Sequence, residues 1–221
     1  MSAGVLVKNY SQPPVCEKEI LCYAGCRNED AKTVALMREC IAEVRGKLTY
    51  KVCYRVLPVA VQGACCDFGT FMLISEKLAA NLRGCREVLL FAATIGVEID
   101  RLIARYGRFS PVKALLFQAI GAERIEALCD TFCADMAQEQ WIGFKPRFSP
   151  GYGDLSLNAQ REVFATLDCA RQIGLSLTDS LLMTPSKSVT AFAGITEPKN
   201  EKLHHKCSLC DNKDCTFRGN I

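Results

Sequence analysis

The sequence predicts an α+β domain built around a mostly antiparallel sheet. Strand-like apolar segments follow one another directly, as hairpin strands do, and also alternate with helical patterns. No G-x-G-x-x-G or G-x-x-x-x-G-K-[ST] motif occurs, which argues against a dinucleotide-binding or P-loop fold. The length of 221 residues suits one large domain or two small ones.

The first half of the chain predicts an arm, four helices and three strands. Residues 1–14 are polar and contain two prolines, which is typical of an arm. Apolar and polar residues alternate over 49–61, as in a half-buried strand, whereas 87–95 is continuously apolar, as in a central strand. The expected elements are helices over 15–25 and 29–45, strands over 49–61 and 71–74, a helix over 75–84 capped by Ser75, a strand over 87–95 and a helix from Gly96 through Arg105.

The second half contains the longest predicted helix. Ser110 followed by Pro111 is a cap with a proline in the first turn, and this helix ends before Gly143. Residues 144–157 are rich in Pro and Gly and predict a loop. We then expect a helix over 158–172 that Gly174 closes, and two strands over 176–183 and 188–195 joined by a turn around Pro185.

Composition and charge exclude several functional classes. Hydrophobic residues make up 49% of the chain and charged residues 23%, as in an ordinary folded protein. The net charge of +3 is too small, and its residues too scattered, to predict a nucleic-acid partner. No apolar run reaches the roughly 18 residues of a membrane span, and the N-terminus lacks the pattern of a secretory signal. We therefore expect a cytoplasmic protein that contacts neither nucleic acid nor membrane.

The most informative short motif is Arg-Phe-Ser-Pro-Gly-Tyr at 147–152. The forked guanidinium of Arg147 suits a carboxylate, which it can bind through two hydrogen bonds. The Pro-Gly step lets the backbone pass close to a ligand at Gly151, and Tyr152 can present its hydroxyl group to a partner. The alternative is a surface turn in which Arg147 simply extends into solvent.

Glu126 is a second candidate, on the predicted long helix. It lies beside the apolar residues Ile125 and Leu128. A carboxylate in this position is either a charge at the rim of the apolar face or a ligand for an ammonium group. The spacing leaves both interpretations open.

Two longer motifs resemble the reactivation domain of cobalamin-dependent methionine synthase in its free-standing bacterial form. The pattern R-x-x-P-G-Y is followed by I-G-x-x-L-T-x-S-x-x-M-x-P-x-x-S-V over 173–189. The segment 118–126 is similar to the family's long helix, and Ala93-Thr94-Ile95-Gly96 with Asp100 is similar to free-standing bacterial versions. The resemblance covers roughly residues 16–195 and implies a curved, mostly antiparallel sheet with helices packed around it. It divides the chain into an arm over 1–14, an activation-like domain over 15–196 and a Cys-rich tail over 197–221.

The resemblance also implies a function and a site. The family binds S-adenosylmethionine and returns inactive cob(II)alamin to methylcobalamin by one-electron reduction coupled to methyl transfer. Arg147 and Glu126 would then hold the carboxylate and ammonium groups of S-adenosylmethionine. Gly151 and Tyr152 would complete the site, with Tyr152 on the cobalt-facing side as the catalytic candidate.

The partners that the resemblance implies are other proteins. The chain has no corrinoid, folate or homocysteine module, so we expect the cobalamin to be held by a methionine synthase or a related corrinoid protein. A flavodoxin-like or ferredoxin-like protein would supply the electron. No tyrosine follows Tyr152, whereas the fused enzymes contribute a later tyrosine to the ligand. The alternative function is therefore a non-catalytic module that senses S-adenosylmethionine or binds a corrinoid protein.

Cysteine usage separates the tail from the rest of the chain. Of 14 cysteines, eleven lie among apolar residues, where they would act as small hydrophobic side chains. Cys207, Cys210 and Cys215 instead form a C-x2-C-x4-C run in a polar segment that follows His204 and His205. Thiolates at this spacing can bind an iron–sulfur cluster, or a zinc ion that a histidine or another cysteine completes. A tail with free thiols is the third interpretation.

Overall fold

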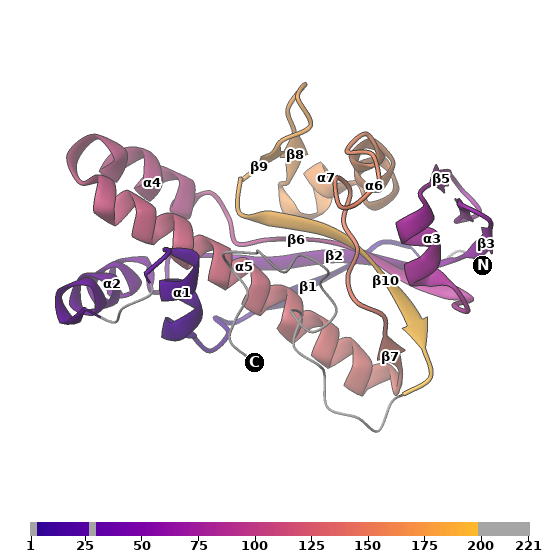
Figure 1. Cartoon of the computed structure of the whole chain (residues 1–221), viewed down its shortest axis with the longest axis horizontal. Coiled ribbons are helices and arrows are strands. Elements are labelled where there is room, and N and C mark those ends of the chain that lie inside the picture. Colours follow the sequence, from indigo (N-terminus) through magenta and orange to yellow (C-terminus); the bar gives the residue numbers. More distant parts are fainter. Residues whose placement is uncertain (1–3, 27–29, 199–221) are drawn as a thin grey trace.

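A five-stranded antiparallel sheet forms the centre of the protein. The computed structural model describes residues 4–26 and 30–198. The strand order is β1-β2-β6-β10-β7, and every neighbouring pair is antiparallel. The predicted α+β class with a curved antiparallel sheet is confirmed (Figure 1). The strands are β1 (Leu6–Tyr10), β2 (Tyr50–Pro58), β6 (Glu87–Thr94), β7 (Gly143–Phe144) and β10 (Ser188–Thr196).

Helices cover both faces of this sheet. One face carries α1 (Glu17–Tyr23), α2 (Ala31–Val44), α4 (Glu98–Phe109) and the 30-residue α5 (Pro111–Gln140). The other carries α3 (Glu76–Leu82), α6 (Ala159–Leu167), α7 (Cys169–Ile173) and a small sheet of β3 (Ala60–Gln62), β4 (Cys65–Asp67) and β5 (Met72–Ile74). A two-stranded ribbon, β8 (Ser176–Leu177) and β9 (Met183–Thr184), precedes β10.

Alternate residues of the central strands enter two separate cores. Val52 and Tyr54 of β2 pack beneath α5, whereas Cys53 points into the core with α3, α6 and α7. The same alternation divides Phe91 from Leu90 on β6. The strand expected over 49–61 is therefore buried on both faces rather than half-buried, because each face has its own layer of helices.

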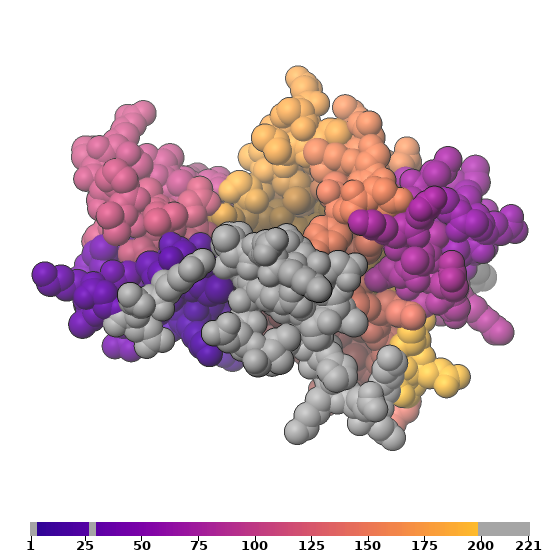
Figure 2. Space-filling model, in the orientation of Figure 1, coloured from indigo at the N-terminus to yellow at the C-terminus, as the bar shows by residue number. Residues whose placement is uncertain are grey.

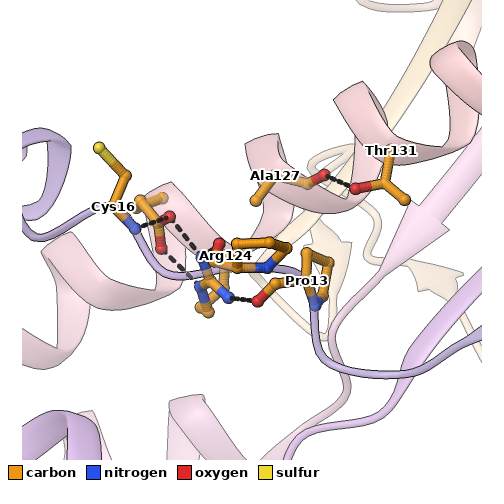
Figure 3. A network of polar contacts seen from close by, with 7 residues as sticks. Pro13, Cys16, Arg124, Ala127 and Thr131 are labelled. Carbon is orange, nitrogen blue, oxygen red and sulfur yellow. Dashed lines mark hydrogen bonds and ion pairs between the residues drawn. The ribbon is translucent and has the colours of Figure 1, made fainter.

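A buried ion pair on α5 attaches the N-terminal segment to the helical layer (Figure 3). The side chains of Glu123 and Arg124 are each 1% exposed. Arg124 donates hydrogen bonds to the carbonyl oxygens of Pro13 and Pro14, both at 2.6 Å. Glu123 accepts one from the backbone N–H of Cys16 at 3.0 Å. The chain between β1 and α1 is thus held by charged groups that have no access to water.

Several boundaries differ from the sequence predictions. The arm expected over 1–14 includes β1, which pairs with β2 along its whole length. The helix expected over 158–172 is interrupted by Asp168, whose φ of 48° lies in the left-handed region and separates α6 from α7. The strand expected over 176–183 reduces to the short strands β8 and β9, because Thr178 and Leu182 close a turn between them. The short strands β4 and β7 were not expected.

The tail cysteines Cys207, Cys210 and Cys215 lie outside the described residues. The eleven other cysteines are free thiols. Most are buried or half-buried as predicted, but Cys16 is exposed. Within residues 4–26 and 30–198, no helix is both long and apolar enough to cross a membrane.

Candidate functional site

Arg147 lies in the loop between β7 and α6, and backbone contacts on both sides hold it against β10. Phe148 and Phe192 exchange two backbone hydrogen bonds of 2.9 and 2.8 Å. On the other side, the N–H of Lys145 donates to the carbonyl oxygen of Gly194 at 2.8 Å. The base of the Arg147 side chain is therefore placed by the central sheet rather than by a mobile turn.

The Pro-Gly-Tyr part of the motif is a compact turn. Gly151 has a φ of +85°, which side-chain-bearing residues rarely adopt. Its N–H donates to the carbonyl oxygen of Leu155 at 2.9 Å, and the N–H of Tyr152 donates to Ser149 at 3.0 Å. A Cβ atom at position 151 would lie 3.2 Å from Cδ1 of Leu157. Glycine is thus needed here for the shape of the turn.

Asp154 fastens this turn to the start of α3. Its carboxylate accepts hydrogen bonds from the Ser75 hydroxyl at 2.5 Å and from the N–H groups of Glu76 and Lys77 at 2.7 and 3.2 Å. These bonds, led by that of Ser75, hold the pKa of Asp154 below its ordinary value. The predicted cap Ser75 also accepts from the N–H of Leu78 at 3.0 Å. The loop is therefore anchored at both ends.

The structure brings Arg147 and Glu126 together. Nη2 of Arg147 lies 2.7 Å from Oε2 of Glu126, and Nη1 lies 2.6 Å from Oδ1 of Asp130. Glu126 and Asp130 are four residues apart on α5, so they share one face of the helix. The Arg147 side chain is 16% exposed, against 30% for Glu126 and 57% for Asp130. Arg147 is thus a mostly buried, ion-paired residue and not an arginine extended into solvent.

The surroundings of Arg147 favour its positive charge. Burial opposes the charged form of the guanidinium, but the neighbouring Cys129, Glu126 and Asp130 outweigh burial and raise its pKa. On α1, burial raises the pKa of the Tyr23 phenol, and the carboxylate of Glu126 adds to this effect. The site therefore offers one permanent cation beside two carboxylates, and one neutral phenol close to them.

Tyr152 packs on Phe148, the residue that follows Arg147 in the loop and whose side chain enters the core with α3 and α6. Its ring packs edge-on against the Phe148 ring, with centroids 5.7 Å apart and an interplanar angle of 86°. Phe148 is buried, whereas Tyr152 is 61% exposed. The loop thus presents a largely exposed aromatic ring five residues after Arg147.

The second sequence motif, over 173–189, has mainly structural contacts. The Ser188 hydroxyl donates to the carbonyl oxygen of Pro185 at 2.8 Å and contacts the Thr94 hydroxyl at 2.9 Å. The N–H of Ser186 donates to the Asp100 carboxylate on α4 at 2.9 Å. In the space-filling view, α4 and the β8–β9 ribbon project from the same side with a hollow between them (Figure 2). The bond from Ser186 to Asp100 connects the two projections.

Three residues near the site were missed by the sequence analysis. Asp130 could have been found, because it follows Glu126 by one helical turn. Tyr23 lies near Glu126 only because α1 packs on α5, and its local sequence carries no signal of this. Asp154 is in the motif loop itself, but its role as an anchor depends on the position of α3. In the described part of the chain, no group of three or more His, Cys, Asp or Glu side chains is arranged to hold a metal ion.

Comparison with known proteins agrees with this geometry. Residues 130–207 match the family model described as vitamin B12 dependent methionine synthase, activation domain. The resemblance to the methionine synthase activation domain is confirmed. The matched segment begins at Asp130 and contains the whole 147–152 motif. A search of curated proteins finds no match.

A solved structure of an activation domain shares the fold. The crystal structure of the MetH reactivation domain bound to AdoHcy superposes with a TM-score of 0.64. The match covers 91% of this chain and 81% of the other, at 14% sequence identity. It therefore extends the likeness to the methionine synthase activation domain beyond residues 130–207, as a likeness of fold.

Proposed function

We propose that the chain binds S-adenosylmethionine at Arg147 and Glu126 and supports reductive methylation of cob(II)alamin on a separate corrinoid protein. The observation that carries this proposal is the 2.7 Å ion pair between Arg147 and Glu126. Arg147 opens the 147–152 motif, which lies within the segment 130–207 that the activation-domain family model matches. The solved relative of the same fold is bound to AdoHcy, a closely related ligand. One electron from an external donor and one methyl group from S-adenosylmethionine are the inputs of this reaction.

The two charged side chains of the site fit the amino-acid part of S-adenosylmethionine. An α-amino acid carries a carboxylate and an ammonium group on the same carbon atom, so its site needs a cation beside an anion. Arg147 is the cation and Glu126 the anion, and both are partly shielded from water, which strengthens their interaction with charged groups. Gly151 would let the backbone of the loop approach the ligand closely.

The exposed face of the loop suits a partner protein. Tyr152 is 61% exposed and packs edge-on against the buried Phe148, so part of its ring is accessible at the surface. We assign Tyr152 to the side that faces the cobalt of a corrinoid protein. That partner would be a cobalamin-dependent methionine synthase or a relative, and a flavodoxin-like or ferredoxin-like protein would donate the electron.

The division into an activation-like domain over 15–196 and a Cys-rich tail over 197–221 belongs to the same proposal. We assign a metal or iron–sulfur cluster to Cys207, Cys210 and Cys215 on the basis of their spacing. A cluster in the tail would give the chain a one-electron carrier, which the reaction needs. A zinc ion would only hold the tail together.

The test is a reactivation assay. The chain is mixed with a corrinoid methionine synthase that lacks its own activation domain, in the cob(II)alamin state, with S-adenosylmethionine and a low-potential reductant. We expect the visible spectrum to change to that of methylcobalamin, and Arg147→Ala to slow this change while the surface variant Arg171→Ala does not. Ligand binding without conversion would favour the sensing module, and absence of binding would contradict both functions.

A further inference from the structure

We infer that Asp130 competes with the carboxylate of the ligand for Arg147 and thereby sets the affinity of the site. The inference rests on the proposed function, because it assumes that Arg147 binds a carboxylate group. Asp130 belongs to no sequence motif that pointed to the ligand. It would act through Arg147, as a residue that determines affinity.

The geometry of Arg147 favours an exchange of partners when a carboxylate ligand binds. Its two terminal nitrogens already contact carboxylates, Nη2 that of Glu126 and Nη1 that of Asp130, at 2.7 and 2.6 Å. A ligand carboxylate that binds in the two-bond manner needs a pair of adjacent N–H groups. Because the Arg147 side chain is only 16% exposed, few directions of approach remain. A ligand carboxylate that approaches the terminal nitrogens therefore meets the carboxylates of Glu126 and Asp130 there and competes with them for the charge of Arg147.

Asp130 is the carboxylate that can yield. Its side chain is 57% exposed, so water can solvate it once it leaves Arg147. Glu126 is 30% exposed and lies beside Tyr23, and the proposed function assigns it to the ammonium group. Exposed ion pairs contribute little to stability, so breaking the contact between Asp130 and Arg147 costs little folding energy. The same release nevertheless lowers the affinity of every ligand that needs Arg147.

This competition has a chemical signature. It acts on ligands that carry the amino-acid carboxylate, such as S-adenosylmethionine and S-adenosylhomocysteine. It does not act on 5′-methylthioadenosine, which keeps the nucleoside and the neutral thioether of S-adenosylhomocysteine but lacks the amino-acid carboxylate and ammonium groups. A general loosening of the site would change the affinity of all three ligands alike.

The experiment compares four proteins by calorimetric titration with S-adenosylmethionine and 5′-methylthioadenosine. They are the wild type, Asp130→Asn, Asp130→Glu and Glu162→Gln, which removes an exposed carboxylate from α6 and serves as the charge-matched control. We expect Asp130→Asn to bind S-adenosylmethionine about two- to five-fold more tightly, the range that follows from the strength of exposed ion pairs. Asp130→Glu and Glu162→Gln should bind as the wild type does, and 5′-methylthioadenosine should bind all four proteins equally.

The outcomes separate this inference from the function on which it rests. Unchanged or weaker binding of S-adenosylmethionine to folded Asp130→Asn, with normal binding to the wild type, overturns the role of Asp130 and leaves the proposed function intact. Equal tightening for 5′-methylthioadenosine also overturns it, because the effect would not depend on a carboxylate. A wild type that binds no S-adenosylmethionine overturns both. Circular dichroism confirms folding, and Asp130→Ser replaces the asparagine variant if that variant does not fold.

Discussion

Glu123 and Arg124 form an ion pair inside the protein, with each side chain only 1% exposed. Neither charge is left with a single partner, because Arg124 also bonds two carbonyl oxygens and Glu123 also accepts the N–H of Cys16. A buried charge requires several hydrogen-bond partners, because removing a charged group from water is costly. Glu123 and Arg124 precede Glu126 by three and two residues on α5, so they fix the part of the helix that carries the candidate site.

The first prediction concerns the stability of this pair. Arg124→Met should lower the free energy of unfolding by about 3–5 kcal/mol, because it leaves the Glu123 carboxylate buried without its cation. Urea denaturation followed by circular dichroism measures the change. Arg101→Met is the matched control, since Arg101 forms an exposed ion pair with Glu98, and its loss should cost less than about 1 kcal/mol. Equal effects of the two substitutions would contradict the structural role of Arg124.

The second prediction concerns the cation of the proposed site. Arg147→Ala should weaken S-adenosylmethionine binding by about 1.5–3 kcal/mol, the usual value of a hydrogen bond to a charged group. Calorimetric titration measures the affinity. The fold should persist, because the backbone on both sides of Arg147 is held by β10 without help from its side chain. Unchanged affinity in the folded variant would remove Arg147 from the site.

The third prediction concerns the anion. Glu126→Gln keeps the shape of the side chain and removes its charge, so we expect weaker binding of S-adenosylmethionine with little change in melting temperature. The same titration and a thermal scan test both parts. If the melting temperature falls strongly while the affinity persists, Glu126 has a structural role as the partner of Arg147 and no direct role in binding.

The fourth prediction concerns pH. Hydrogen bonds from Ser75, Glu76 and Lys77 lower the pKa of Asp154 in the folded state, so its carboxylate stabilises the fold above the pKa of an unfolded aspartate, about 3.9. This stabilisation is lost as the pH falls through the lowered value. The wild type should therefore melt above Asp154→Asn at pH 7, and the difference should shrink steadily below about pH 4. Asp179→Asn, at an exposed position, is the control for the removal of a surface carboxylate as such.

Local patterns predicted most of the helices and the central strands. The continuous apolar run 87–95 correctly predicted a central strand. A strand that is buried on both faces needs apolar side chains on both, and β6 is buried in this way. The alternation over 49–61 predicted the strand but not its second buried face. Lys51 and Arg55 flank Cys53 on that face, and the burial of Cys53 depends on the packing of α6 and α7. The same limit applies to the site. The motif around Arg147 was visible in the sequence, whereas its contact with Asp130 depends on how the loop crosses α5.

The last prediction concerns Cys207, Cys210 and Cys215. If they hold an iron–sulfur cluster, protein purified without oxygen should be brown and absorb broadly near about 400 nm, as thiolate-ligated iron does. Truncation after Thr196 should then abolish the colour and slow reductive methylation, while S-adenosylmethionine still binds at Arg147 and Glu126. A zinc site would instead give a colourless protein with about one zinc per chain, which a chelator removes without unfolding the domain. If the folded protein contains neither metal and an alkylating reagent modifies all three thiols at once, the metal proposal fails and the electron must come entirely from a partner protein.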